Sequence, residues 1–240
     1  MGCCMPDFTR PTHRLVQGVL RALDAEFLAR TRCYFGGGTF LTMALGEYRE
    51  SADIDFLCAE RAGYRELRST VSDKLLGKIV RAKLTLAREV IADRYGIRTV
   101  IETEGVRIKF EIVLEGRIEI DGGLDDSLRV PTLGQESCFA EKFLANADRW
   151  NDNAFLNRDI IDLAFMRARW GEAACAAGKT VARAAYGRDV DTCARRAATL
   201  LLEDAAYRRR CVAGLAVSDT RTLGVGLKAL AARRGGKTGA

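Results

Sequence analysis

The sequence predicts an α+β protein in which a small mixed-sheet core is followed by a helical C-terminal region. Three observations support this class. Segments with strand-like alternation lie in the first half of the 240 residues, glycine-containing turns separate them, and from about residue 135 onward only helical patterns remain. A content of 48% hydrophobic and 29% charged residues is typical of a globular protein. We therefore expect a core domain over residues 1–130 and a helical domain over residues 131–240.

The first elements are indicated by apolar spacing. Residues 11–30 carry apolar side chains along one helical face, at Leu15, Val16, Val19, Leu20, Leu23, Phe27 and Leu28. A short buried strand is expected over residues 33–35, ending at Gly36, Gly37 and Gly38. Residues 39–45 then read as a second helix.

The middle of the core domain is predicted to alternate between strands and a helix. Residues 53–57 read as a strand and residues 61–94 as helical, with a basic, exposed middle. Two further strands are expected near residues 97–103 and 106–115, joined by a turn at Glu104–Gly105. Gly122–Gly123 and Pro131 are interpreted as the boundary that precedes the helical domain.

The glycine turn and the Asp53-Ile54-Asp55 strand together indicate phosphate and metal chemistry. Glycine lets the backbone approach an anion closely, and the free amides at the start of residues 39–45 would face a phosphate. Side chains two apart on a strand share a face, about 6.6 Å apart along the chain, so Asp53 and Asp55 can share metal ions. Hard carboxylate oxygens beside a phosphate site suit Mg²⁺, with Mn²⁺ as an alternative. A nucleoside triphosphate (NTP) is a ligand that the glycine turn and the two aspartates could bind together.

These residues resemble those of a known family. The pattern Gly37-Gly38-Thr39, then Arg49-x-Ser51-x-Asp53-Ile54-Asp55-Phe56, is similar to the signature of AbiEii/AbiGii-type nucleotidyltransferases. They belong to the DNA polymerase beta nucleotidyltransferase superfamily and include the MenT toxins of type IV toxin–antitoxin systems. A second block, 141–149 followed by 158–163, strengthens the resemblance, which covers roughly residues 33–166. It implies a nucleotidyltransferase core in which Gly37, Gly38, Thr39, Arg49 and Ser51 bind the nucleotide.

The resemblance also implies a third carboxylate beside Asp53 and Asp55, from a neighbouring strand. Glu111 is the best candidate, because it lies in mid-strand on the polar face and could bind metal or accept the hydroxyl proton. The superfamily more often has aspartate there, and Glu111 could instead be a solvated residue paired with Lys109 or Arg107. Glu115 and Glu119 are the fallback candidates.

Further site residues are expected in the helical region. Lys142 would neutralise the triphosphate, the alternative being a surface lysine paired with Glu141 or Glu136. Asp159 matches a family position and could orient Lys142 or contact the nucleotide. Asp162 shares its helix face and is interpreted as structural, holding Arg158 or a helix neighbour. In the core, Arg49 could bridge phosphates or brace the two aspartates.

Cysteine and histidine usage excludes other chemistries. The eight cysteines include no Cys-x-x-Cys pair, and His13 is the single histidine, so a zinc site of ordinary spacing is not expected. A hydrolase built on a catalytic histidine is disfavoured because His13 lies far from any nucleophile motif. Cys33 and Cys58 are interpreted as buried apolar residues, and free thiols suit a reducing cytoplasm. No segment has the length and hydropathy of a membrane span, so no membrane partner is expected.

The charge distribution favours an RNA acceptor. The net charge is +6, and basic clusters occur at Arg208–Arg210 and residues 233–237. A basic surface attracts RNA through its phosphates, although a solvated surface explains these clusters equally well. We therefore expect a toxin that transfers a nucleotide from an NTP to RNA, in particular a tRNA end, with a cognate antitoxin as a possible partner. A transferase acting on a small molecule such as an aminoglycoside, and a catalytically silent binding module, stay open as alternatives.

Overall fold

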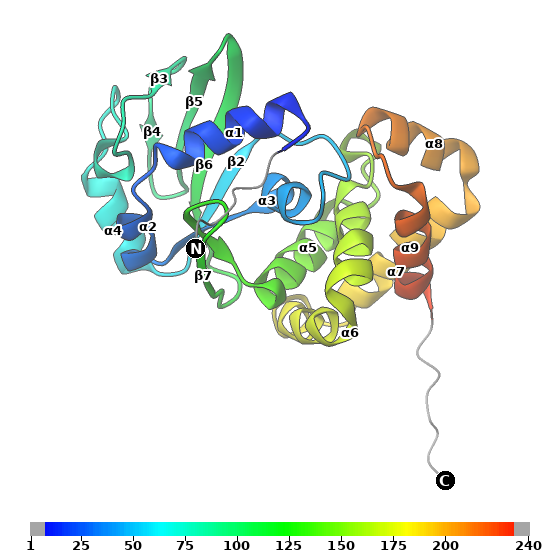
Figure 1. The fold of residues 1–240 in the computed structure, drawn as a ribbon. Helices are drawn as coiled ribbons and strands as arrows, with labels where there is room; N and C mark the ends of the chain where they lie inside the picture. The colour runs from blue at the N-terminus through cyan, green and yellow to red at the C-terminus, as the bar shows by residue number, and fades with distance from the viewer. Residues whose placement is uncertain (1–7, 233–240) are drawn as a thin grey trace. The chain divides into compact units, whose positions relative to one another are not determined.

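The computed structural model describes residues 8–232, which form two compact units divided between Cys138 and Phe139 (Figure 1). Within the described residues, unit 1 contains every strand, whereas unit 2 is helical. The sequence placed this division at residues 130 and 131. It falls later because the residues just after 130 still belong to the sheet of unit 1.

Unit 1 is built on one mixed sheet of eight strands in the order β3-β5-β6-β2-β1-β8-β7, with β4 also pairing with β5. The pairs β2–β6 and β1–β8 are parallel and the other pairs are antiparallel. The strands are β1 (Cys33–Gly36), β2 (Ile54–Cys58), β3 (Thr85–Leu86), β4 (Ile91–Ala92), β5 (Ile97–Thr103), β6 (Val106–Leu114), β7 (Gly122–Asp125) and β8 (Val130–Leu133). The predicted strands at 33–35, 97–103 and 106–115 are thus found with nearly the expected bounds.

The helices of unit 1 differ from the prediction at the N-terminus. They are α1 (Pro11–Arg21), α2 (Ala25–Arg30), α3 (Gly37–Ala44), α4 (Arg61–Ser69) and a 3₁₀ turn, η1 (Gly77–Ile79). The single helix expected over residues 11–30 is two helices, because Asp24 caps α2 by accepting a 2.9 Å hydrogen bond from the amide of Phe27. The helix expected near residues 39–45 begins two residues early, at Gly37.

The helix predicted over residues 61–94 is wrong beyond Ser69. Residues 81–92 in the rest of this segment make backbone hydrogen bonds with distant parts of unit 1. The amide of Arg81 donates to the carbonyl of Ala22, and β3 and β4 both pair with β5. Pairing with a sheet edge has overridden the local helix preference of an Arg-, Lys- and Leu-rich stretch.

The glycines and proline interpreted as a domain boundary lie inside a β-hairpin instead. Gly122 and Gly123 begin β7, and Pro131 lies in β8 opposite Leu124. Because β8 also pairs with β1, at Phe35 and Thr132, the hairpin extends the sheet. Turn-forming residues in the sequence were therefore mistaken for a linker.

Aromatic side chains fill the buried face of the central strands. Phe56 on β2 lies between Phe35 on β1, with ring centroids 5.4 Å apart, and Phe110 on β6, with centroids 6.1 Å apart. Helices α2, α3 and α4 pack against β1 and β2. The buried Cys33 and Cys58 lie opposite each other on these two strands as free thiols, as expected of small apolar residues.

Unit 2 is a helical bundle, as predicted. Helix α5 (Gln135–Arg149) begins at the end of unit 1, and α6 (Arg158–Tyr186), α7 (Asp189–Glu203), α8 (Ala205–Gly214) and α9 (Thr220–Ala231) follow. Helix α6 is kinked at Gly171, where φ is 90°. Helices α6, α7 and α9 pack against one another. Among residues 8–232, no helix combines the length and hydropathy needed to cross a bilayer. The basic cluster at residues 233–237 lies outside the described residues.

Candidate active site

The turn that leads from β1 into α3 packs directly against the motif aspartate. Gly37 has φ of +69°, and a Cβ there would lie 2.8 Å from Oδ2 of Asp55. A side chain at Gly38 would run into the Arg49 guanidinium. Only glycine combines this backbone conformation with such close approach. The glycine turn and the Asp53-Ile54-Asp55 motif are thus neighbours in space as well as in sequence.

Strand pairing aligns two of the predicted carboxylates in one row. In the parallel pair β2–β6, Asp55 lies opposite Glu111, and in β5–β6 Glu111 lies opposite Arg98. Paired residues on adjacent strands project to the same face, so Asp55, Glu111 and Arg98 form a polar row across three strands. Asp53 lies two residues before Asp55 and is exposed, whereas Ile54 between them is fully buried. The expected two-faced strand is therefore found.

Lys109 occupies the same polar face as these carboxylates. Its Nζ lies 2.5 Å from Oε2 of Glu111, which is the pairing considered as an alternative to a role for Glu111 in binding metal. Burial acts to lower the pKa of Lys109, but the hydrogen bond to Glu111 and the charges of Glu111, Asp55 and Asp53 outweigh it and raise the pKa. The ammonium thus partly neutralises the charge of these three carboxylates.

Two of the ligands that a magnesium ion needs are present, the carboxylates of Asp53 and Asp55. Asp53 and Asp55 offer hard oxygens on one face, and Mg²⁺ is commonly held by one or two carboxylates together with substrate phosphates and water. Within residues 8–232, no cluster of three or more Asp, Glu, His or Cys side chains could hold a metal ion. The residues present therefore fit a magnesium ion that is held by two aspartates and completed by phosphate oxygens of the substrate.

Arg49, Ser51 and Thr39 hold the loop between α3 and β2 against the glycine turn. Arg49 is 3% exposed, and its Nη1 donates a 2.9 Å hydrogen bond to the carbonyl of Glu50. The hydroxyls of Thr39 and Ser51 lie 2.8 Å apart. Since Arg49 lies beside Gly38, it is placed to brace the glycine turn, a contact that the sequence did not predict.

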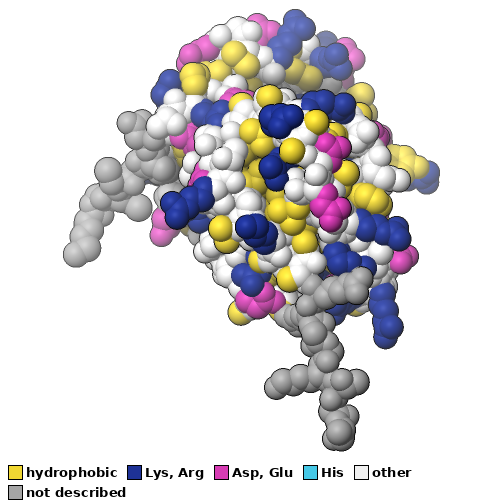
Figure 2. Space-filling view, turned by 90° about the vertical axis from the view of Figure 1, so that its right-hand side faces the viewer, with side chains coloured by type: hydrophobic (Ala, Val, Ile, Leu, Met, Phe, Trp, Pro, Cys, Tyr) yellow, Lys and Arg dark blue, Asp and Glu magenta, His cyan; other side chains and the backbone are white. Residues whose placement is uncertain are grey.

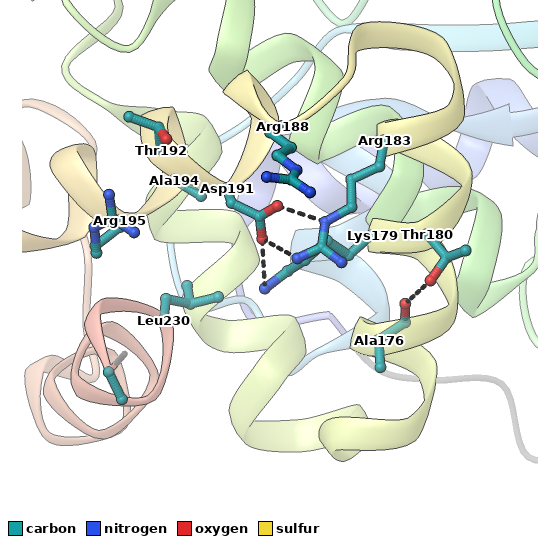
Figure 3. Close-up of a pocket in the computed structure, with 11 residues that line it drawn as sticks. Ala176, Lys179, Thr180, Arg183, Arg188, Asp191, Thr192, Ala194, Arg195 and Leu230 are labelled. Carbon is teal, nitrogen blue, oxygen red and sulfur yellow. Dashed lines mark hydrogen bonds and ion pairs between the residues drawn. The ribbon is translucent and has the colours of Figure 1, made fainter. Parts of the chain in front are cut away.

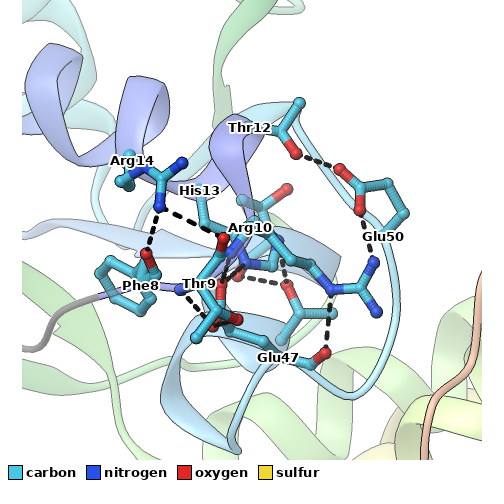
Figure 4. A network of polar contacts seen from close by, with 10 residues as sticks. Phe8, Thr9, Arg10, Thr12, His13, Arg14, Glu47 and Glu50 are labelled. Carbon is cyan, nitrogen blue, oxygen red and sulfur yellow. Dashed lines mark hydrogen bonds and ion pairs between the residues drawn. The ribbon is translucent and has the colours of Figure 1, made fainter.

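A polar network at the start of α1 anchors the same loop from the other side (Figure 4). The Glu47 carboxylate accepts hydrogen bonds from the amide of Thr9 at 2.7 Å and the amide of Arg10 at 3.0 Å. The fully buried His13 places its Nδ1 2.8 Å from the same carboxylate. Burial acts to raise the pKa of Glu47, but the hydrogen bonds from Thr9, Arg10 and His13 prevail and lower the pKa to about 2. His13 is therefore structural.

Replacing Glu47 by Gln is expected to lower the free energy of unfolding at pH 7 by about 1–3 kcal/mol, because Thr9, Arg10 and the buried His13 lose a charged acceptor. The folded pKa of about 2 lies below the ordinary value of 4.5, so this contribution is complete above pH 4.5 and declines as the pH falls toward 2. Urea unfolding at pH 7, 4 and 3 should show the gap between wild type and Glu47→Gln closing. Exposed Glu119→Gln is the control, and a gap that is independent of pH would contradict the assignment.

A cleft of about 550 Å³ opens beside the carboxylates, on the same face of the sheet. Asp53 forms part of its wall, together with the segment that carries β4 and with strands β5 and β6. Its basic lining residues are Arg88, Arg98, Arg107 and Lys109. This grouping of basic side chains beside Asp53 was not predicted, in part because residues 61–94, which include Arg88, were interpreted as helical. The alternation of Arg107, Lys109 and Glu111 was the available signal.

The predicted residues of the helical region form a buried ionic network within unit 2. Lys142 is 7% exposed, with its Nζ 2.8 Å from Oδ2 of Asp162 and 3.0 Å from Oδ1 of Asp159. Arg149 donates two hydrogen bonds to Asp159, from Nε at 2.7 Å and from Nη2 at 3.0 Å. Burial acts to raise the pKa of Asp159, but Lys142 and Arg149 hold it well below its ordinary value.

This network corrects two interpretations. Lys142 is a buried lysine rather than a surface one, and Asp162 pairs with it. Asp159 does contact Lys142, as one reading expected. Arg149 was not assigned a role, although its position seven residues after Lys142 puts both on one face of α5.

Comparisons with known proteins agree with this architecture. A family model described as the nucleotidyl transferase AbiEii toxin of type IV toxin–antitoxin systems matches residues 19–216. The crystal structure of a nucleotidyltransferase candidate from H. pylori is 16% identical, covers 92% of this chain and 96% of its own, and has a TM-score of 0.54. JHP933 from Helicobacter pylori is 15% identical over 92% of this chain and 93% of its own, with a TM-score of 0.51. No curated protein matches the sequence. At such identities the two structures show a shared fold.

Proposed function

The chain belongs to the AbiEii family of nucleotidyl transferase toxins of type IV toxin–antitoxin systems, and we propose that it transfers a nucleoside monophosphate from an NTP to a hydroxyl at an RNA end, tRNA in particular. One observation carries the proposal. Asp55 and Glu111 lie in one polar row, with Asp53 on the same face and the Gly37–Gly38 turn packed against Asp55. This arrangement joins a phosphate-binding turn to carboxylates that can bind metal.

In the proposed reaction the acceptor hydroxyl oxygen forms a bond to the α-phosphorus of the NTP. The bond from that phosphorus to the oxygen bridging to the β-phosphate breaks, and pyrophosphate leaves. Asp53 and Asp55 would hold Mg²⁺ or Mn²⁺, which when bound neutralises charge that develops on the phosphates. Gly37, Gly38 and Thr39 would bind the phosphates through backbone amides, while Arg49 and Ser51 keep that turn in place.

Glu111 is proposed as the acceptor of the hydroxyl proton. It lies beside Asp55, and its partner Lys109 is half-exposed, so that a bound phosphate could take over the ammonium and free the carboxylate. Lys142 and Asp159 are proposed as further contributors from unit 2, with Lys142 supplying positive charge to the triphosphate and Asp159 orienting it. Asp162 holds Lys142 from the other side.

The cleft beside Asp53 supports a polyanionic acceptor over a cationic drug. Four basic side chains line it, and Asp53 and Glu89 are the acidic lining residues. Three of the basic residues form ion pairs within unit 1: Arg98 with Asp93, Arg107 with Glu102 and Lys109 with Glu111. Guanidinium and ammonium groups are hydrogen-bond donors that suit phosphate oxygens, which RNA carries and an aminoglycoside lacks. RNA therefore fits this entrance better than an aminoglycoside does.

The same proposal includes a cognate antitoxin, which the toxin family implies, and a cytoplasmic site of action. Six cysteines of the described chain are free thiols, as suits a reducing compartment.

The decisive experiment incubates the purified full chain with total RNA, Mg²⁺ and each of the four α-labelled NTPs in turn. We expect label in RNA with at least one NTP, and loss of labelling when EDTA is added. Label that appears only in an added aminoglycoside would favour the small-molecule reaction. Absence of transfer to either acceptor would favour a catalytically silent binding module.

Replacing Glu111 by Gln is expected to lower the rate of transfer by about 10²–10⁴-fold while leaving NTP affinity within a few-fold, because only proton transfer is lost. Single-turnover kinetics at saturating NTP measures this. Glu102→Gln on β5 is the matched control, since Glu102 also lies on this sheet, opposite Arg107. If Glu111→Gln keeps its rate within a few-fold, Glu111 is only the ion-pair partner of Lys109.

A further inference from the structure

A second basic pocket lies within unit 2 (Figure 3). It encloses about 610 Å³ between the C-terminal half of α6, the first half of α7 and the end of α9. Four cationic residues line it, Lys179, Arg183, Arg188 and Arg195, with Asp191 as the acidic one. The lining therefore carries a net charge of +3, from four positive charges and one negative.

Asp191 fixes two of the cations and leaves the other two available. Arg183 donates to both of its carboxylate oxygens, from Nε at 2.5 Å and from Nη2 at 2.7 Å, and Nζ of Lys179 lies 3.6 Å away. Burial acts to raise the pKa of Asp191, but these two cations prevail and lower it, so the carboxylate stays ionised. Within the described chain, no carboxylate pairs with Arg188 or Arg195. Figure 3 shows Lys179, Arg183 and Arg188 gathered around Asp191, with Arg195 on its other side.

This arrangement suits phosphate groups. Guanidinium groups bind phosphate oxygens through two parallel hydrogen bonds, and Arg188 and Arg195 have such donors available. Asp191 keeps Arg183 oriented by two hydrogen bonds, so this guanidinium is already ordered before an anion binds. Like charges gathered in one cavity repel one another, and a bound polyanion would relieve that repulsion.

The Arg208–Arg210 cluster is less suited to this task than the sequence suggested. Nη1 of Arg208 donates to the carbonyls of Leu201 and Leu202, at 3.2 and 3.5 Å. Arg210 stacks over the Tyr207 ring, 5.3 Å from its centroid. Two of the three guanidinium groups thus make contacts within unit 2. Figure 2 shows Lys and Arg side chains scattered over one face of the molecule rather than gathered in one patch.

We propose that the pocket of Lys179, Arg183, Arg188 and Arg195 binds backbone phosphates of the acceptor RNA. The identity of this polyanion rests on the proposed function, whereas the anion site itself rests on the charge and geometry of unit 2. Binding here contributes affinity without reading sequence, since phosphate contacts position a nucleic acid and base contacts specify it.

The test compares two charge-reversed forms of the full chain. Arg188→Glu combined with Arg195→Glu changes the pocket, and Arg196→Glu combined with Arg221→Glu makes the same charge change at exposed positions of α7 and α9 outside it. Fluorescence anisotropy measures the affinity of each form for three labelled ligands in separate titrations, a single-stranded RNA, ATP and polyglutamate. Each titration is repeated over a range of salt concentrations. Circular dichroism confirms that both forms are folded.

We expect the pocket variant to bind RNA at least about tenfold more weakly and the control variant to stay within about twofold of wild type. The slope of log affinity against log salt should become shallower by about 1.4 in the pocket variant, from two lost phosphate contacts. RNA affinity that falls equally in both variants, or in neither, would overturn the proposal. An equal loss of polyglutamate binding would overturn phosphate recognition, and a loss confined to ATP would overturn RNA as the ligand.

The labelling assay on wild type separates the two proposals. Pocket-dependent RNA binding without nucleotide incorporation would refute the proposed function and leave this inference standing. Incorporation into RNA, with the pocket and control variants binding RNA equally, would refute only this inference.

Discussion

Replacing either Asp53 or Asp55 by Asn is expected to reduce nucleotide transfer by on the order of 10³-fold or more. Each change removes a negative charge from the proposed metal site, where charge stabilisation contributes several kcal/mol to the transition state. Asp53 is exposed and Asp55 half-buried, and asparagine preserves the shape of both, so the thermal midpoint should change little. Incorporation of labelled NTP into RNA at several Mg²⁺ concentrations measures the effect.

The matched control for these variants is Asp126→Asn, an exposed aspartate of unit 1 in the turn between β7 and β8. It should retain wild-type activity. If Asp53→Asn or Asp55→Asn keeps activity within a few-fold, neither carboxylate holds a catalytic metal. The polar row across β2, β6 and β5 would then be only a solvated sheet surface.

Replacing Lys142 by Ala is expected to lower the free energy of unfolding by about 3–5 kcal/mol, because it leaves buried carboxylates without their shared cation. Asp159 and Asp162, at 3% and 0% exposed, would both lose the ammonium that they contact, while Arg149 would still contact Asp159. Urea unfolding at pH 7 measures this loss. The pKa of Asp159 is depressed, so its contribution in wild type is present above the ordinary pKa of 3.8 and is lost as the pH falls below it.

Lys142→Arg and Lys228→Ala complete the experiment. In Lys142→Arg the positive charge is kept in a side chain of different shape, so part of the free energy of unfolding lost in Lys142→Ala should be restored. Lys228 is exposed on α9, so Lys228→Ala should lower the free energy of unfolding by less than about 0.5 kcal/mol. NTP titration of Lys142→Arg, which keeps the network charged, tests the proposed contact with triphosphate separately. Stability of Lys142→Ala equal to wild type would refute the network, and NTP affinity of Lys142→Arg equal to wild type would refute the direct contact.

The sequence by itself determined the features that depend on local periodicity. Alternation along residues 53–57 placed Asp53 and Asp55 on one face, and Glu104–Gly105 marked the hairpin between β5 and β6. Helical spacing beyond residue 135 predicted unit 2. A short stretch of sequence is enough to recognise each of these patterns, because side-chain direction repeats every 2 residues in a strand and every 3.6 residues in a helix.

Only the tertiary structure decided which distant segments meet. The register that puts Glu111 beside Asp55 arises from parallel pairing of β2 and β6, which lie far apart in the chain. The same kind of pairing drew residues 85–92 onto β5 and so placed Arg88 in the cleft beside Asp53, with Arg98, Arg107 and Lys109. The partners of Lys142 likewise depend on how α5 packs against α6. Local propensity is worth a few tenths of a kcal/mol per residue, and burial and pairing outweigh it wherever the two disagree.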